Sequence, residues 1–169
     1  MIHLKVSADG WLQCGNRIFR CTLGRGGVTT DKREGDGATP AGAYPLRQLL
    51  YRSDRLAPPT NALPTSPLRP RDGWCDDPGH SAYNRPVTLP LDASAESMWR
   101  DDHLYDLVVV LGYNDDPVVS GLGSAIFLHV ASPENSPTEG CIALAKEDLL
   151  TVLADITPSS DILIEIPQG

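Results

Sequence analysis

The stretch SAIFLHVASPENSPTEGCIALAKEDLLTVLADI, residues 124–156, contains a strand pattern, an irregular segment and the clearest helix pattern of the chain. Residues 124–130 are rich in β-branched and aromatic side chains, which favour a strand. Residues 131–140 contain two prolines and a glycine and predict a loop. Residues 146–156 place five aliphatic side chains on one side of a helix, with two acids in its first turn. The stretch therefore predicts a strand, a loop and a helix.

Strand patterns dominate the rest of the chain. They are short, alternate in polarity and end at glycine, proline, asparagine or aspartate. The predicted strands cover residues 2–6, 11–14, 17–23, 105–113, 124–130 and 161–166. Residues 41–52 and 92–103 predict short helical turns, and the proline-rich residues 57–86 predict a long ordered loop. The pattern indicates a mainly β protein, with two packed or curled sheets and a few short helices.

Length and composition limit the class of protein. The chain has 169 residues, 41% of them apolar and 21% charged, which predicts one soluble domain over residues 1–169. Its net charge of −8 argues against a nucleic-acid partner, because neutralising phosphates needs clustered lysine and arginine. No run approaches the roughly 18 apolar residues that cross a bilayer, and the N-terminus resembles no leader. We expect no membrane partner and a cytoplasmic location, or a periplasmic one if a leader has been removed.

The cysteines are Cys14, Cys21, Cys75 and Cys141. Two disulfides are conceivable, but a reducing compartment disfavours them and the spacing matches no metal knuckle. Cys14 and Cys21 lie in two alternating runs around Gly15–Asn16, which predicts a hairpin turn. We expect both to be packed strand residues, since free cysteine behaves as a small buried hydrophobe.

His129 and Cys141 stand twelve positions apart. Because alternate strand residues face opposite sides, His129 shares a face with Ala125 and Phe127 and points away from the more aliphatic face. The loop after the strand can return Cys141 to its side, and Gly140 frees the backbone so that the amides of residues 140 and 141 could hold a substrate oxygen. The pair could be a nucleophile and its base, or a hydrogen-bonded core histidine and a buried thiol. Spacing alone does not choose between them.

Three segments together resemble a known family. The pattern H-(loop)-T-E-G-C-I-A-L, made by His129 and residues 138–144, is similar to the active-site signature of YkuD-type L,D-transpeptidases, a strand histidine followed by a loop and Ser/Thr-His-Gly-Cys. DKREGDGATPAGAYPL, residues 31–46, resembles the family's Thr-Pro-x-Gly-x-aromatic strand entry, and GYNDDPVVSGLGSAIFLHV, residues 112–130, resembles the strand pair that leads into its histidine. The resemblance spans residues 24–150 and implies a single YkuD-like β-sandwich domain.

The resemblance also implies a reaction. Cys141 would attack as a thiolate the carbonyl that joins the L centre of a stem-peptide diamino acid to a terminal D-alanine. His129 would lower the thiol pKa as an imidazolium and move the proton, and the amides near Gly140 would hold the oxyanion. The substrate would be a peptidoglycan-derived muropeptide, with no cofactor and no metal. Where the family usually has histidine this chain has Glu139, and where it has arginine or asparagine this chain has Ala143. Both changes alter the pocket wall.

The expected location favours hydrolysis over cross-linking. Cross-links are made outside the membrane, whereas a cytoplasmic enzyme would meet recycled muropeptides, so we expect an L,D-carboxypeptidase. An L,D-transpeptidase that makes cross-links or exchanges D-amino acids is the alternative. A noncatalytic β-domain that binds wall peptides is a third reading, from a different class. The oligomeric state does not follow from the sequence.

Further candidates are substrate contacts and one metal site. Thr138 and Glu139 are expected beside the acyl group, while Tyr83, Asn84 and Arg85 could line the cleft after the long loop, or serve an ordinary turn.

The metal candidate combines Cys75, Asp76, Asp77 and His80. We expect no metal there, because a zinc site needs ligands at regular spacings and no second pair of cysteines or histidines completes this one.

Overall fold

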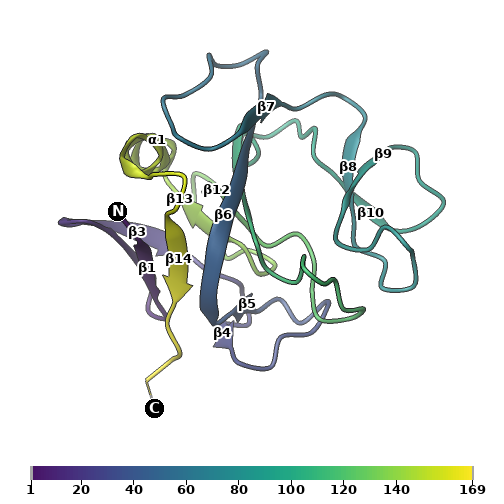
Figure 1. Ribbon diagram of the computed structural model, residues 1–169, viewed down its shortest axis with the longest axis horizontal. Helices are drawn as coiled ribbons and strands as arrows, with labels where there is room; N and C mark the ends of the chain where they lie inside the picture. The colour runs from purple at the N-terminus through teal and green to yellow at the C-terminus, as the bar shows by residue number, and fades with distance from the viewer. Residues whose placement is uncertain (1, 169) are drawn as a thin grey trace.

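The computed structural model describes residues 2–168. It is built mainly of strands, and among the described residues one α-helix occurs, α1 (Lys146–Asp155) (Figure 1). The strands are β1 (Leu4–Ser7), β2 (Trp11–Cys14), β3 (Arg17–Thr22), β4 (Val28–Thr29), β5 (Thr39–Pro40), β6 (Gly42–Tyr51), β7 (Thr65–Pro67), β8 (Asp72–Cys75), β9 (Pro86–Thr88), β10 (Ala95–Ser97), β11 (Leu107–Leu111), β12 (Phe127–Val130), β13 (Ile142–Leu144) and β14 (Asp161–Ile164). The mainly β prediction is confirmed.

The main sheet closes on itself. Its nine strands run in the order β11-β12-β13-β3-β2-β1-β14-β6-β7, and β11 also pairs with β6. The ten-residue strand β6 allows this, because its first half pairs with β14 and its second half with β11. The result is a barrel-like sheet, with β7 added beside the second half of β6. A separate sheet of β10, β8 and β9 lies apart from α1 in Figure 1.

Strand alternation divides the buried residues into two clusters. The first fills the interior of the main sheet and includes Leu128 of β12 and Ile142 of β13, together with the buried face of α1. The second includes Phe127, Trp74 of β8 and Cys141. It therefore lies on the outer face of β12, between the main sheet and the small one. The predicted division of the two faces of residues 124–130 is confirmed.

The predictions for the N-terminal strands and their cysteines are confirmed. The hairpin is confirmed, since Cys14 pairs with Arg17 across Gly15–Asn16 and Gly15 has φ +59°. Cys14 and Cys21 are both buried, unpaired strand residues, as expected.

The predicted helical turns in residues 41–52 and 92–103 are wrong: the first is β6 and the second contains β10. The segment 57–86 is not all loop, because it contains β7 and β8 and ends where β9 begins. In each case pairing with a distant strand outweighs local propensity.

Candidate active site

Cys141 lies at the turn that leads into β13, beside β12. Its Sγ–H donates to the carbonyl oxygen of Ala125 over 3.1 Å, and the amide of Phe127 donates to Sγ over 3.4 Å. The side chain is buried in the second apolar cluster, with only 8% of the residue exposed. Burial raises the pKa of the Cys141 thiol to about 12, and the charge of Glu96 adds to the rise.

His129 points to the same outer face. It is 4% exposed, and the ring of Tyr105 meets its ring edge-on at a centroid distance of 5.3 Å. Nδ1 lies 2.8 Å from the carbonyl oxygen of Val130. Because a carbonyl can only accept, Nδ1 carries the proton and Nε2 has a free lone pair. Burial lowers the pKa of His129 to about 4.

Cys141 and His129 line one cavity of about 500 Å³. Within residues 2–168 no hydrogen bond joins Sγ to the imidazole. With pKa values of about 12 and about 4, both groups are neutral at pH 7. In the free protein desolvation disfavours both charged forms and so works against the imidazolium that the resemblance implies.

The turn before Cys141 needs glycine. Gly140 has φ +139°, and a Cβ there would lie 2.8 Å from the Ala38 carbonyl oxygen. Thr138 Oγ1 accepts from the Gly140 amide over 3.1 Å and donates to the Cys141 carbonyl over 2.6 Å. Thr138 thus shapes the turn as well as lining the cavity, and the Gly140 amide already has a partner. Glu139 lines the cavity with a mostly exposed carboxylate that pairs with Arg25 over 3.0 Å.

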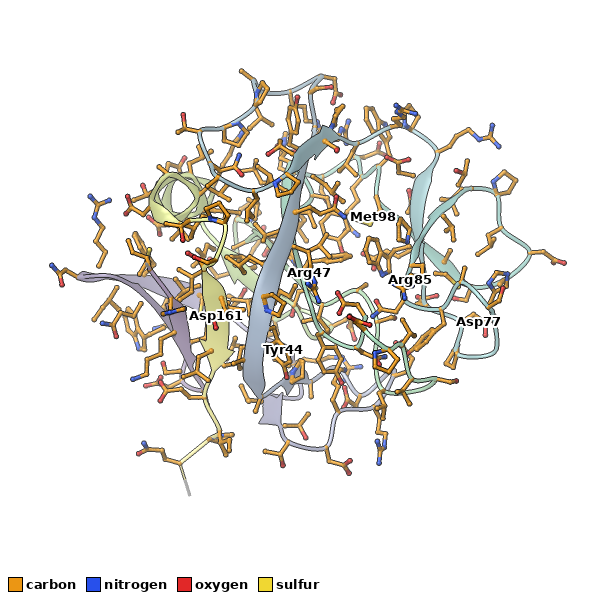
Figure 2. The ribbon with its side chains drawn as sticks, viewed as in Figure 1. Tyr44, Arg47, Asp77, Arg85, Met98 and Asp161 are labelled. Carbon is orange, nitrogen blue, oxygen red and sulfur yellow. The ribbon has the colours of Figure 1, made fainter. Side chains whose placement is uncertain are left out.

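The three predicted substrate contacts at residues 83–85 lie outside the cavity of Cys141 and His129. Tyr83 is buried, and its hydroxyl donates to Glu34 over 2.6 Å. Asn84 is also buried, and its side-chain amide makes four hydrogen bonds, one to a side chain and three to the backbone. Arg85, labelled in Figure 2, is exposed. It donates to the Asp115 carbonyl and lines a separate cavity of about 130 Å³. None of the three lines the cavity of Cys141.

Five charged or aromatic residues of the cavity were not predicted as site residues. They are Glu34, Asp76, Glu96, Arg100 and Tyr105. Tyr105 donates a hydrogen bond to Glu96, and burial raises the pKa of that carboxyl. The sequence contains no clear signal for Glu96, which lies between Ala95 and Ser97 in the three-residue strand β10.

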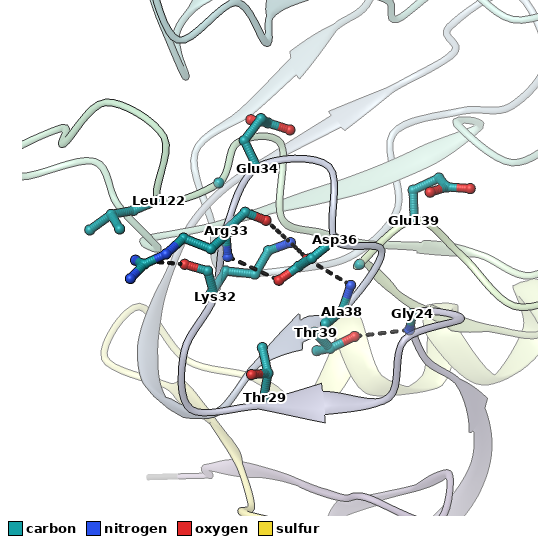
Figure 3. Close-up of polar contacts among 12 residues, drawn as sticks. Gly24, Thr29, Lys32, Arg33, Glu34, Asp36, Ala38, Thr39, Leu122 and Glu139 are labelled. Carbon is teal, nitrogen blue, oxygen red and sulfur yellow. Dashed lines mark hydrogen bonds and ion pairs between the residues drawn. The ribbon is translucent and has the colours of Figure 1, made fainter.

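Glu34 comes from the loop between β4 and β5. Figure 3 shows this loop folded around a buried Lys32, whose ammonium bonds Asp36 and the Arg33 carbonyl. The same picture shows the Gly24 amide bonded to Thr39 below the loop. These contacts fix the conformation of the loop, and the loop in turn positions Glu34 at the cavity.

Two of the four residues weighed as metal ligands have local hydrogen-bond partners, whereas the buried Oδ1 of Asp76 has none among the described residues. Asp77 accepts from the Gly79 amide and His80 Nδ1 from the Ala82 amide, each over 2.9 Å, so both cap their own turn. Cys75 is a buried free thiol. Across residues 2–168 no three such side chains gather in a geometry that could hold a metal ion. No helix in that range is long and apolar enough to cross a membrane.

Two solved structures match this chain at low similarity. An L,D-transpeptidase from Mycobacterium smegmatis is 10% identical, with a TM-score of 0.45 over 98% of this chain and 58% of that one. The helical cell shape determining protein Pgp2 from Campylobacter jejuni is 14% identical, with a TM-score of 0.41 over 99% of this chain and 48% of that one. This chain thus spans only 48–58% of their lengths. No curated protein matches it.

The family comparison covers nearly all of the chain. Residues 9–164 match the YkuD family, described as the L,D-transpeptidase catalytic domain. The matched residues include the strand of His129, the turn of Cys141 and the cavity that both of them line. The chain therefore belongs to the YkuD family of L,D-transpeptidase catalytic domains.

Proposed function

We propose that this protein is a cysteine-dependent L,D-carboxypeptidase that removes the terminal D-alanine from peptidoglycan stem peptides through a thioester on Cys141. The observation that carries the proposal is the shared cavity, onto which the thiol of Cys141 and the imidazole of His129 both open. The free lone pair on His129 Nε2 supplies a base, and the Cys141 thiol supplies the nucleophile.

The neutral resting pair defines the order of proton transfers. His129 Nε2 takes the Sγ proton as sulfur attacks the carbonyl carbon, because neither group is charged beforehand. The Gly140 amide is already bonded to Thr138, so the Cys141 amide is the better placed donor for the oxyanion. Collapse breaks the C–N bond, and His129 returns the proton to the departing amine of D-alanine. Water, deprotonated by His129, then attacks the thioester carbonyl. The C–S bond breaks and His129 returns the proton to sulfur, which restores the thiol.

The charge of the cavity supports a diamino acid at the acyl position. Four carboxylates line the cavity, those of Glu34, Asp76, Glu96 and Glu139, of which Glu139 is paired with Arg25. Arg100, which also lines it, is paired with Asp102 over 2.6 Å. A negative wall attracts an ammonium group and disfavours an acidic side chain. A stem peptide whose diamino acid keeps a free amine satisfies this requirement.

Hydrolysis is favoured by the size of the cavity. A volume of about 500 Å³ is in the range of sites for one small ligand. One stem-peptide end would occupy much of it and leave room for water more readily than for a second peptide. Transpeptidation, which makes cross-links or exchanges D-amino acids, is the second candidate, and family membership supports it. The cytoplasmic location stays a prediction, and this chemistry does not depend on it.

The test is mass spectrometry of a disaccharide-tetrapeptide after incubation with the protein, with and without a D-amino acid. Loss of one alanine supports hydrolysis, whereas exchange of the alanine or a joined dimer supports transpeptidation. Cys141→Ser should abolish every product. Cys14→Ala, at a buried thiol in the other cluster, is the control and should keep activity. If the wild-type protein binds the tetrapeptide without any turnover, the noncatalytic wall-peptide-binding reading replaces the enzyme.

A further inference from the structure

Ala125 has an unusual backbone conformation at the edge of the cavity. Its φ of +55° lies in the left-handed region, which residues with a side chain rarely adopt. In this conformation its carbonyl accepts the Sγ–H of Cys141 over 3.1 Å. A carbonyl oxygen stabilises a thiol as donor and repels a thiolate. The conformation of Ala125 therefore bears directly on the reactivity of Cys141.

Asn84 holds Ala125 in place. Its Oδ1 accepts from the Ala125 amide over 3.0 Å and from Trp74 Nε1 over 2.9 Å. Its Nδ2 donates to the carbonyls of Tyr113 over 3.1 Å and Asn114 over 2.8 Å. These four bonds use two donors and two acceptor sites, the full capacity of an amide side chain. Asn84 is 5% exposed and has no donor or acceptor free to bind a substrate. It can therefore affect the site only through Ala125.

The residues just before Ala125 are fixed as well. Tyr83 accepts the Gly123 amide over 3.0 Å, and Ser124 donates to Glu34 over 2.6 Å. These bonds hold the neighbouring turn. Neither of them involves Ala125 itself. The bond that Asn84 accepts from the Ala125 amide does, and Ala125 is the residue whose carbonyl contacts the thiol.

We infer that Asn84 is a positioning residue: by fixing Ala125 it holds the Cys141 thiol on the Ala125 carbonyl, in a resting orientation of low reactivity. Substrate binding must then release the thiol toward His129. The inference rests on the proposed function only in taking Cys141 as the nucleophile.

The test is the rate at which iodoacetamide alkylates Cys141, followed by peptide mass spectrometry across pH. Asn84→Gly removes the side chain without adding strain, because the backbone at residue 84 has φ +56°, which glycine adopts freely. We expect alkylation at pH 7.5 to become about tenfold faster and its pH midpoint to fall, since a fall of one unit in the thiol pKa yields about ten times more thiolate.

Two control variants separate positioning from general loosening. Trp74→Phe removes one bond to Asn84 and leaves the bond to Ala125, so Cys141 should alkylate at the wild-type rate. Asn84→Asp keeps an oxygen that can accept from Ala125 but loses both donors to the carbonyls of Tyr113 and Asn114, so it should restore the slow alkylation only in part. If folded Asn84→Gly alkylates with the wild-type rate and pH midpoint, Asn84 has a structural role only and the inference is overturned.

Ala125→Gly covers the case in which Asn84→Gly does not fold. Glycine suits the φ at residue 125, so the variant should fold, while its freer backbone should speed alkylation. A wild-type alkylation rate would then overturn the inference. Alkylation needs no substrate. A protein that shows the expected thiol rates but releases no D-alanine would therefore overturn the peptidase and leave the positioning role supported.

Discussion

Acid should destabilise this protein through His129, and replacing it with asparagine should remove that effect. The folded protein holds the imidazole neutral down to a pKa of about 4, whereas the ordinary histidine value is 6.5. Between those pH values the unfolded chain binds a proton that the folded chain refuses, so stability is full above pH 6.5 and falls as the pH drops. Each pKa unit corresponds to about 1.4 kcal/mol, so the loss should reach about 3 kcal/mol near pH 4.

His129→Asn isolates this contribution. Its amide can still donate to the Val130 carbonyl, and it has no proton to take up in this range. The assay is urea unfolding at half-unit steps from pH 7.5 to 3.5, comparing the free energies of unfolding of the two proteins. The other acidic groups titrate equally in both proteins. Between pH 7.5 and about pH 4 the difference in their free energies of unfolding should therefore shift by about 3 kcal/mol in favour of the variant. A difference that stays constant within about 0.5 kcal/mol would refute the reasoning and mean that water reaches His129.

Four further outcomes follow from the site and the packing around it. The kcat/KM for D-alanine release should fall in acid only near pH 4, where the base His129 becomes protonated, because this parameter reports the free enzyme. A fall of kcat/KM near pH 6.5 would contradict a desolvated His129. Glu96→Gln should lower kcat/KM about tenfold for a tetrapeptide with a free amine, an effect of about 1.4 kcal/mol, but not for its N-acetylated analogue; equal losses would argue against an ammonium site. Gly24→Ala should cost roughly 1–3 kcal/mol in urea unfolding, because its Cβ would lie 2.3 Å from the Gly37 carbonyl oxygen; an unchanged midpoint would show that the turn can yield. Phe127→Ala should cost about 3–5 kcal/mol by the same assay, since Phe127 is fully buried under Trp74, and a loss below 1 kcal/mol would show that the cluster collapses into the gap.

The sequence by itself determined the features that depend on near neighbours. Alternation in residues 124–130 assigned His129 to the face opposite Leu128, because successive strand residues point to opposite sides. The turn at Gly15–Asn16 and helix α1 were also predicted, since each follows from short-range backbone and side-chain preferences. Family membership was predicted for the same reason: its signature lies in short contiguous segments.

Only the tertiary structure decided what surrounds the thiol. Residues 41–52 carry a helical pattern but form β6, because β14 and β11 satisfy its backbone from both edges. The small sheet of β8, β9 and β10 covers the outer face of β12 and brings Glu96 to the cavity. Burial there disfavours the charged forms of Cys141 and His129, which works against the thiolate and imidazolium that the resemblance implies. Desolvation depends on atoms brought together from distant parts of the chain, so no local pattern around residues 129 and 141 could have predicted it.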